Sequence, residues 1–390
     1  MAKQLLVFLI SATIIFLLFI VSPLITYNTA VEESFARSVS IVDKVIKNPP
    51  GQSDAYLFID VSRSKKLVEL EDATGNLSIT DRMRLATFFS LITADTAIRP
   101  KAVICDLLFD LSTEDDDTLQ RAMEKLRPLL IPFGEDDNGP LLPVFKKIET
   151  GYAGYLQSSG WEASEKLVKY HLWPEQNKPT IPLKLKANID GENFARSGGF
   201  IWNGKGIYYA NLIPSFTLRK EPAYAEGASS FYYLKELTDL FQTQNKALLA
   251  KFIRNRIIFL GDFENDVHDT YEGKYSGTHI LANVFQSFDK GENQITLGWL
   301  LYVAIFSMLV ALYVYFAEMR DLEELTEAKR KPGWQKNAWR LFKLLSITGV
   351  LWIGCFFSFF KFSVFLNPLL VMICLGVVLA MKKRIQFLIR

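Results

Sequence analysis

The chain has 390 residues, of which 49% are apolar and 22% are charged, and 44 Lys plus Arg nearly balance 42 Asp plus Glu. A net charge of +2 argues against a nucleic-acid partner, because proteins that bind nucleic acid usually concentrate basic residues. Only three cysteines occur, which excludes a disulfide framework. The mean hydropathy is positive and there are 30 Phe residues, so we expect part of the chain to lie in lipid.

Four uncharged apolar runs predict four transmembrane helices. A helix of roughly 17 to 25 residues spans a hydrocarbon core of about 30 Å. The runs are residues 5–25, 295–317, 344–360 and 362–381. We interpret the first as an uncleaved anchor, because it is longer than the apolar part of a signal peptide and lacks a small-x-small cleavage site. For the last two runs the alternative is a buried helical hairpin of a soluble domain.

Basic residues next to these runs predict the orientation of the chain. Lys and Arg are frequent in residues 318–343 and in the tail 382–390, and Lys3 precedes the first run. The positive-inside rule then places the N-terminal residues 1–4, the loop and the tail in the cytoplasm, with residues 27–294 outside. We therefore expect a multi-pass protein of the inner cell membrane that contacts the lipid bilayer and carries a large extracytoplasmic domain.

Within residues 27–294, short apolar runs alternate with amphipathic helix patterns. Residues 55–59 and 102–105 are continuous apolar runs, and in residues 256–260 such a run follows Arg256; runs of this kind are typical of strands buried on both faces. Helix patterns follow, beginning near residues 80, 112 and 276. Residues 151–216 suggest antiparallel strands and loops instead. The fold class is therefore α/β, a mainly parallel sheet with helices on both faces, together with the four transmembrane helices.

Several of these segments carry motifs of a known family. They are FIDVS at 58–62 with ITDR at 79–82, KAVICDLLFD at 101–110, and RIIFLGD at 256–262 with GTHILANV at 277–284. In this order they resemble the type 2 CHASE domain, an extracytoplasmic sensory module of bacterial histidine kinases and cyclases. The resemblance implies one helix before the sensor and three after it, which matches the topology expected from charge. Family members usually continue into a catalytic domain, whereas nine residues follow Met381, so we expect a separate partner to carry the output.

Carboxylates close three of the expected strands. In open parallel sheets ligands bind outside the carboxyl ends of the strands. The candidate ligand-binding residues are Asp60, Asp106, Asp262 and Asp269. Oxygen ligands with one or two imidazoles would suit a divalent cation, the only cofactor that we consider. The candidate metal ligands are Asp60, Asp106, Asp262, His268 and His279. The simpler alternative is that these Asp side chains cap helices and order turns.

Motifs of common enzymes are missing from the sequence, including G-x-S-x-G, H-E-x-x-H, the phosphate-binding loop and the dinucleotide fingerprint, so we do not expect an enzyme.

The leading hypothesis is a membrane sensor whose outer domain detects a small-molecule or envelope signal and relays it to a separate signalling enzyme, with a homodimer expected by analogy with receptors. The alternative is a scaffolding component of a cell-envelope complex. Exposure of an aromatic set would favour it, namely Tyr152, Tyr155, Trp161, Trp173 and Trp202. A metal-dependent enzyme would need the strand-end carboxylates within a few Å of one another.

Overall fold

The structure is a computed structural model that describes most of the chain. The described residues are 2–24, 30–47, 54–69, 76–95, 98–136, 139–153, 166–218, 231–243, 246–327, 333–367 and 372. They belong to two compact units. The helical unit comprises Met1–Tyr27, Ser197–Asn211 and Gly291–Arg390, and the α/β unit comprises Asn28–Arg196 and Leu212–Lys290. The expected tail 382–390 and most of the run 362–381 lie outside the described residues.

A mainly parallel sheet forms the centre of the α/β unit. Its strand order is β13-β1-β14-β4-β5, with β6 and β7 both pairing with β5, and only β6 runs antiparallel. The strands are β13 (Phe231–Tyr233), β1 (Tyr56–Asp60), β14 (Ile257–Gly261), β4 (Ala102–Asp106), β5 (Leu129–Asp136), β6 (Gly139–Leu141) and β7 (Glu149–Tyr152). All five residues of β1 and of β14 are buried, as expected for strands covered on both faces. The α/β part of the predicted fold class is therefore confirmed.

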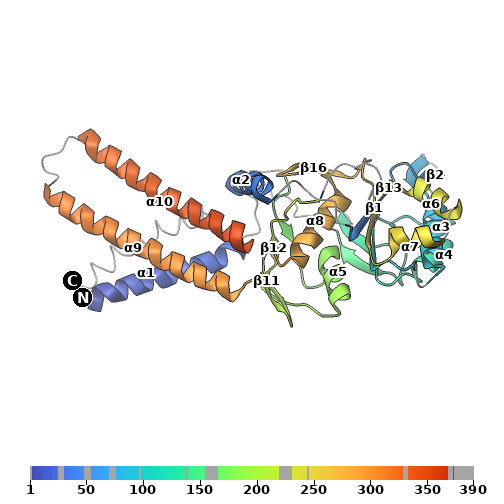
Figure 1. The fold of residues 1–390 in the computed structure, drawn as a ribbon, viewed down its shortest axis with the longest axis horizontal. Helices are drawn as coiled ribbons and strands as arrows, with labels where there is room; N and C mark the ends of the chain where they lie inside the picture. The colour runs from blue at the N-terminus through green and yellow to red at the C-terminus, as the bar shows by residue number, and fades with distance from the viewer. Residues whose placement is uncertain are drawn as a thin grey trace. The chain divides into compact units, whose positions relative to one another are not determined.

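One face of the sheet is covered by α3 (Arg82–Thr93), α4 (Asp116–Met123), α6 (Leu234–Thr243) and α7 (Lys246–Ile253), and the opposite face by α5 (Ile181–Asp190) and α8 (Gly277–Asp289) (Figure 1). Alternate side chains of each strand point to opposite faces. Leu57 and Ile59 accordingly belong to the core beneath α3, whereas Phe58 stacks on Phe259 with ring centroids 5.7 Å apart. Phe259 lies 6.5 Å from Phe285 of α8. The sheet therefore lies between two helical layers.

The close packing of α8 on β14 depends on Gly261. A Cβ atom at this position would lie 1.9 Å from the Oγ1 atom of Thr278, in the first turn of α8. Ser276 caps the same turn, since its side chain accepts a hydrogen bond of 3.3 Å from the backbone N–H of His279. A glycine at the end of β14 therefore lets the start of α8 approach the sheet.

Smaller elements complete the α/β unit. They are α2 (Ala30–Lys47), the hairpin β2 (Lys65–Glu69) and β3 (Asn76–Thr80), β8 (Tyr170–His171), and the hairpin β15 (Val267–Thr270) and β16 (Gly273–Ser276). The short strands β9 (Ala195–Ser197) and β12 (Asn211–Leu212) each include a chain boundary of this unit. Helix α2 is held by a buried ion pair, in which Lys169 Nζ lies 2.6 Å from Glu32 Oε1. A more exposed pair joins Lys166 to Glu33 at 2.8 Å. These contacts fix α2 to the segment before β8.

The helical unit contains α1 (Ala2–Val21), the 3-10 turn Ser22–Leu24, α9 (Leu297–Glu327) and α10 (Gly333–Phe362), together with the hairpin β10 (Phe200–Asn203) and β11 (Gly206–Tyr209). Polar contacts connect these elements. The indole N–H of Trp299 donates to Ser358 Oγ at 3.0 Å, and Tyr302 donates to the carbonyl of Gly354 at 2.7 Å. Tyr209 donates to the carbonyl of Ile20 at 2.9 Å. Side-chain hydrogen bonds therefore join α9 to α10 and the hairpin to α1.

The prediction of four transmembrane helices is wrong, because no helix within the described ranges is both long and apolar enough to cross a membrane. The first α-helix stops at Val21, since a residue before a proline disfavours helical geometry and Pro23 follows. The second and third runs lie in α9 and α10, which also include charged stretches of the 318–343 segment. Helix α10 ends at Phe362 and Ser363 has φ 54°, so the fourth run does not begin as a helix. The predicted multi-pass topology and inner-membrane localisation are wrong with it.

Candidate functional site

Three neighbouring strands of the sheet end side by side. The pairing register aligns Asp60 of β1 with Gly261 of β14, and Gly261 with Asp106 of β4. The chain leaves β1 and β4 toward helices on one face, whereas it leaves β14 toward α8 on the other face. In open α/β sheets, ligands bind outside the carboxyl ends of the strands where neighbouring connections go to opposite faces. We call this region the strand-end crevice.

Asp60 is buried and accepts hydrogen bonds from its own loop. Oδ1 accepts from the backbone N–H of Ser62 at 2.9 Å and from that of Phe263 at 3.1 Å, and Oδ2 accepts from the Ser62 hydroxyl at 2.8 Å. Burial raises the pKa of the Asp60 carboxyl, the donors of Ser62 and Phe263 oppose this rise, and the negative charge of Asp262 adds to it. Asp60 therefore ties the loop after β1 to the loop after β14.

Asp262 forms an ion pair with Lys65 of β2, whose Nζ lies 2.6 Å from Oδ2. Oδ1 accepts from the backbone N–H groups of Asn265 at 2.9 Å and Glu264 at 3.2 Å, which orders the turn after β14. Burial would raise the pKa of this carboxyl, but the hydrogen bonds from Lys65 and Asn265 outweigh it and lower the pKa. The Asp262 carboxylate is thus stabilised by the ammonium group of Lys65 and by backbone N–H groups of the turn after β14.

Asp106 lies on the other side of Gly261 with different neighbours. Its Oδ2 accepts a hydrogen bond of 3.0 Å from the hydroxyl of Thr278. Burial, with repulsion from Asp266, raises the pKa of Asp106 to about 7, against smaller opposing effects of Thr278 and His268. His268 Nε2 lies 2.8 Å from Asp266 Oδ1, and this hydrogen bond raises the pKa of the imidazole, with a further contribution from the charge of Asp106. Asp106, Asp266 and His268 therefore form one electrostatic cluster.

The remaining predicted site residues lie elsewhere. His279 is buried, its ring centroid is 4.9 Å from that of Phe58 and 4.8 Å from that of Phe263, and its Nδ1 lies 3.2 Å from Ser276 Oγ. Asp269 is an exposed residue of the β15–β16 hairpin. The structure therefore groups Asp60 with Asp262, and Asp106 with His268, while His279 packs among aromatic rings.

Strand β14 separates Asp60 on one side from Asp106 on the other. Neighbouring strands lie about 4.8 Å apart, so the backbones at Asp60 and Asp106 are about 10 Å apart, with Gly261 between them. Among the described residues, no group of three or more His, Cys, Asp or Glu side chains is arranged to hold a metal ion. The oxygen atoms of Asp60 and Asp262 are also engaged by the donors described above. The divalent cation stays a prediction without support from this geometry.

A small pocket of about 190 Å³ opens at the carboxyl end of β4. Its walls come from β3, from the start of α3 and from the segment 107–111, and its charged lining residues are Lys65, Arg82 and Asp110. Lys65 and Arg82 are absent from the sequence-based candidates, although Arg82 belongs to the ITDR motif. The sequence offered no signal for either residue, because the burial of Arg82 and the pairing of Lys65 depend on segments distant in the chain.

Arg82 is 4% exposed and shapes one wall of this pocket. Its guanidinium forms an ion pair with Asp116 and donates hydrogen bonds to the carbonyl of Leu111 at 2.5 Å and to Thr113 Oγ1 at 3.3 Å. Burial would raise the pKa of Asp116, but donors from Thr113 and Arg82 outweigh it, so the pKa is lowered. The charged head of Arg82 therefore holds the loop between β4 and α4 in one conformation.

Comparisons with protein-family models, with curated proteins and with solved structures find no match to this chain. The CHASE-domain resemblance is therefore neither supported nor opposed by a relative, and it stays a prediction. Of the aromatic set linked to scaffolding, Tyr155 and Trp161 lie outside the described residues. Tyr152 and Trp173 are partly buried, and Trp202 is 38% exposed in the other unit. The scaffolding alternative also stays a prediction.

Proposed function

We propose that the α/β unit is a sensory domain that binds a small polar ligand in the strand-end crevice, and that a separate protein carries the output. The observation that supports this function is the pocket lined by Lys65, Arg82 and Asp110 at the carboxyl end of β4. It lies where the topology of open α/β sheets places ligands. Lys65 and Arg82 are each paired with an Asp, and Asp110 adds an exposed carboxylate, so the lining is polar and suits a small polar ligand that carries a basic group.

The size of the pocket limits the ligand. Sites for drug-sized molecules usually have volumes of about 300 Å³ or more. A pocket of about 190 Å³ instead suits a metabolite with few non-hydrogen atoms, such as a free amino acid. The wall held by Arg82 is already ordered, which lowers the entropy that the ligand must offset.

The lining residues also connect the pocket to the helical layer. Thr80 is the last residue of β3, Arg82 is the first residue of α3, and Leu111 lies in the loop that leads to α4. Helices α3 and α4 pack against each other over the same core. A ligand that binds one arrangement of these segments better than another would shift α3 and α4 together, because it stabilises the arrangement that it contacts best. This coupling is the route by which a partner could read the occupied state.

A thermal-shift screen of the full-length chain with the twenty free amino acids tests the proposal, followed by calorimetric titration of each amino acid that stabilises it. The variant Ser78→Phe adds a ring at an exposed position of the pocket wall, and Asn76→Phe adds the same ring at an exposed position of β3 outside the pocket. We expect an amino acid to stabilise the unchanged chain and Asn76→Phe, but not Ser78→Phe. Equal stabilisation of both variants, or no stabilisation by any amino acid, would refute the proposed site.

A further inference from the structure

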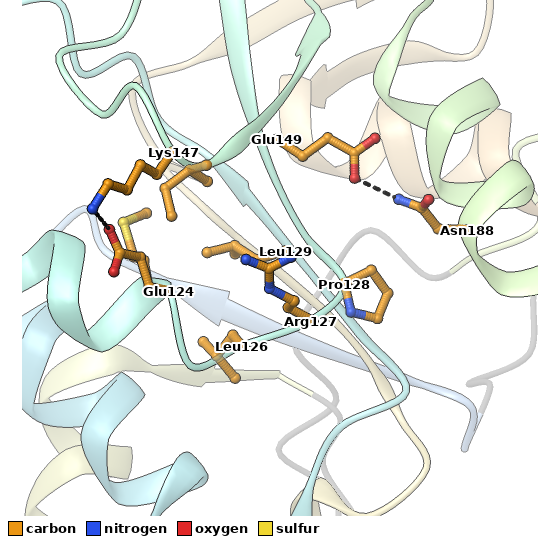
Figure 2. A pocket seen from close by; sticks show the side chains of 10 residues that line it. Glu124, Leu126, Arg127, Pro128, Leu129, Lys147, Glu149 and Asn188 are labelled. Carbon is orange, nitrogen blue, oxygen red and sulfur yellow. Dashed lines mark hydrogen bonds and ion pairs between the residues drawn. The ribbon is translucent and has the colours of Figure 1, made fainter.

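A second and larger cavity lies at the opposite edge of the sheet. Its volume is about 380 Å³, and it is lined by the turn between α4 and β5, by residues 147–149 at the start of β7, and by Asn188 of α5 (Figure 2). Strands β5 and β7 begin here, whereas the strand-end crevice lies where β1, β14 and β4 end. The two sites therefore share no residue.

The floor of this cavity is apolar. Met123, Leu126, Leu129 and Ile148 line it, and each of these side chains is also part of the buried core of the α/β unit. An apolar group that settles on this floor gains free energy from the surface that it removes from water. A cavity of about 380 Å³ falls within the range that holds small molecules in proteins, about 300 to 1,000 Å³.

Two carboxylates at the cavity are each engaged by a neighbour. Glu124 lies 3.8 Å from Lys147 Nζ and accepts a hydrogen bond of 2.8 Å from the amide of Gln120. Glu149 accepts a hydrogen bond of 2.9 Å from the side chain of Asn188, and its other carboxylate oxygen lies 3.8 Å from the Nζ atom of Lys184. The ammonium groups of Lys147 and Lys184 therefore each lie close to a carboxylate already.

Arg127 differs from the other charged residues of the cavity. It is exposed, and within the part of the chain that the structure describes its guanidinium makes no hydrogen bond or ion pair. Figure 2 shows the Arg127 side chain between the Glu124–Lys147 pair and the Glu149–Asn188 pair. A guanidinium without an anion beside an apolar floor is suited to a planar carboxylate, which it can bind through two parallel hydrogen bonds.

The backbone around Arg127 is fixed on both sides. The N–H of Leu126 donates to the carbonyl of Met123 at 2.9 Å, and the carbonyl of Pro128 accepts from the N–H of Val103 at 3.0 Å. These bonds join the turn to α4 and to β4, so the base of the Arg127 side chain is held in place before a ligand arrives. Such preorganisation strengthens binding, because less conformational entropy is lost.

We infer that this cavity binds a small monocarboxylate with an apolar body. The carboxylate contacts the Arg127 guanidinium, and the apolar body lies on the floor formed by Met123, Leu126, Leu129 and Ile148. A singly charged anion fits better than a phosphate dianion, because Glu124 and Glu149 flank the site and repel additional negative charge. This second site is independent of the ligand proposed for the strand-end crevice.

The test uses the full-length chain with benzoate and hexanoate as probes, and with benzamide and hexanamide as uncharged controls of the same shape. Binding is followed by the methyl NMR signals of Met123 and Ile148, which line the cavity. The variant Arg127→Gln removes the guanidinium. Arg99→Gln is the matched control, because it removes an exposed arginine that does not line this cavity, just before β4.

We expect at least one carboxylate to shift the signals of Met123 and Ile148 in the unchanged chain and in Arg99→Gln. In Arg127→Gln the affinity should fall by about tenfold or more, since a charge-assisted bidentate contact is lost. The inference is overturned if neither carboxylate shifts these signals, if the amides bind as tightly as the acids, or if Arg127→Gln keeps the affinity of Arg99→Gln. Because Arg127 lies at the other edge of the sheet, these results do not depend on the outcome at the strand-end crevice.

Discussion

Replacing Asp106 with Asn should make the protein more stable at neutral and alkaline pH. Burial beside Asp266 raises the pKa of the Asp106 carboxyl from 3.8 to about 7. The folded state therefore binds this proton more tightly than the unfolded state does. The resulting stability is fully present below about pH 4 and is lost as the pH rises through about 7. Asn carries no charge at any of these pH values, so the variant should not lose this stability.

The expected change in the free energy of unfolding follows from the change in the pKa of Asp106. A change of about three pKa units corresponds to about 4 kcal/mol, at about 1.4 kcal/mol per unit. Part of this difference is already present near pH 5, because the unfolded carboxyl is mostly ionised there. We therefore expect the free energy of unfolding of Asp106→Asn, relative to the unchanged protein, to increase by about 3 kcal/mol between about pH 5 and about pH 8.

Urea unfolding at a series of pH values, followed by circular dichroism, measures this difference. The matched control is Asp110→Asn, which removes the same charge from an exposed residue four positions along the chain, in the loop after β4. The pH-dependent increase should be larger for Asp106→Asn than for Asp110→Asn, because Asp106 is the buried carboxyl of the two. Parallel stability curves for Asp106→Asn and the unchanged protein would show that burial of Asp106 does not shift its titration, and would refute the reasoning.

Two further predictions concern packing and charge in the α/β unit. Gly261→Ala should destabilise the protein by about 1 to 3 kcal/mol in urea unfolding, because its Cβ would lie 1.9 Å from Thr278 Oγ1; an unchanged midpoint would mean that α8 moves away without cost. Lys169→Met should cost about 3 to 5 kcal/mol, since it leaves the Glu32 carboxylate buried without its cation. Lys166→Met, which breaks a more exposed pair, should cost less than about 1 kcal/mol, and equal losses in the two variants would contradict the role of burial.

The central strands could be predicted from sequence because each is a continuous apolar run with an Asp at or just after its end. Parallel strands end at the same edge, so the prediction that Asp60, Asp106 and Asp262 share that edge required no knowledge of strand order. Their separation into two groups did require it. Only the position of β14 between β1 and β4 places Gly261 between Asp60 and Asp106, and local pattern carries no information on that order.

Other parts of the site depend on contacts between distant segments. Lys65 pairs with Asp262 across 197 positions of the chain, and Arg82 reaches Asp116 from another element. Arg127 stands out only because the charges around it pair with one another in space. None of these relations has a periodicity or a motif that a single sequence would reveal.

Helix α5 was missed for a local reason. The sequence PLKLKA at 182–187 alternates apolar and charged residues, which is the period of a strand, and the region was predicted to contain strands and loops. The structure forms a helix with proline in its first turn and Gly191 at φ 67° as its C-terminal cap. Proline is favoured in the first turn of a helix and glycine at such a cap, so these end signals outweigh the alternation between them.

At the ends of the chain, hydropathy alone led to the wrong prediction of membrane helices. Apolar composition indicates where a chain avoids water, but it does not determine where a helix stops. The Ser22–Leu24 turn after α1 and the positive φ of Ser363 after α10 interrupt two of the runs. Proline and left-handed backbone are features of single residues, and an average over a window of about 19 residues hides them.

The place of β14 in the sheet also matters for how the protein is made. This strand lies between β1 and β4, yet in chain order it is the last strand of the described sheet. While the ribosome is still synthesising the segment before Ile257, β1 and β4 each expose an edge whose partner does not yet exist. Exposed edges of this kind favour aggregation, and pairing between strands far apart in sequence is slow. The pairing of β1 and β4 with their shared neighbour can therefore be completed only after the residues of β14 have emerged.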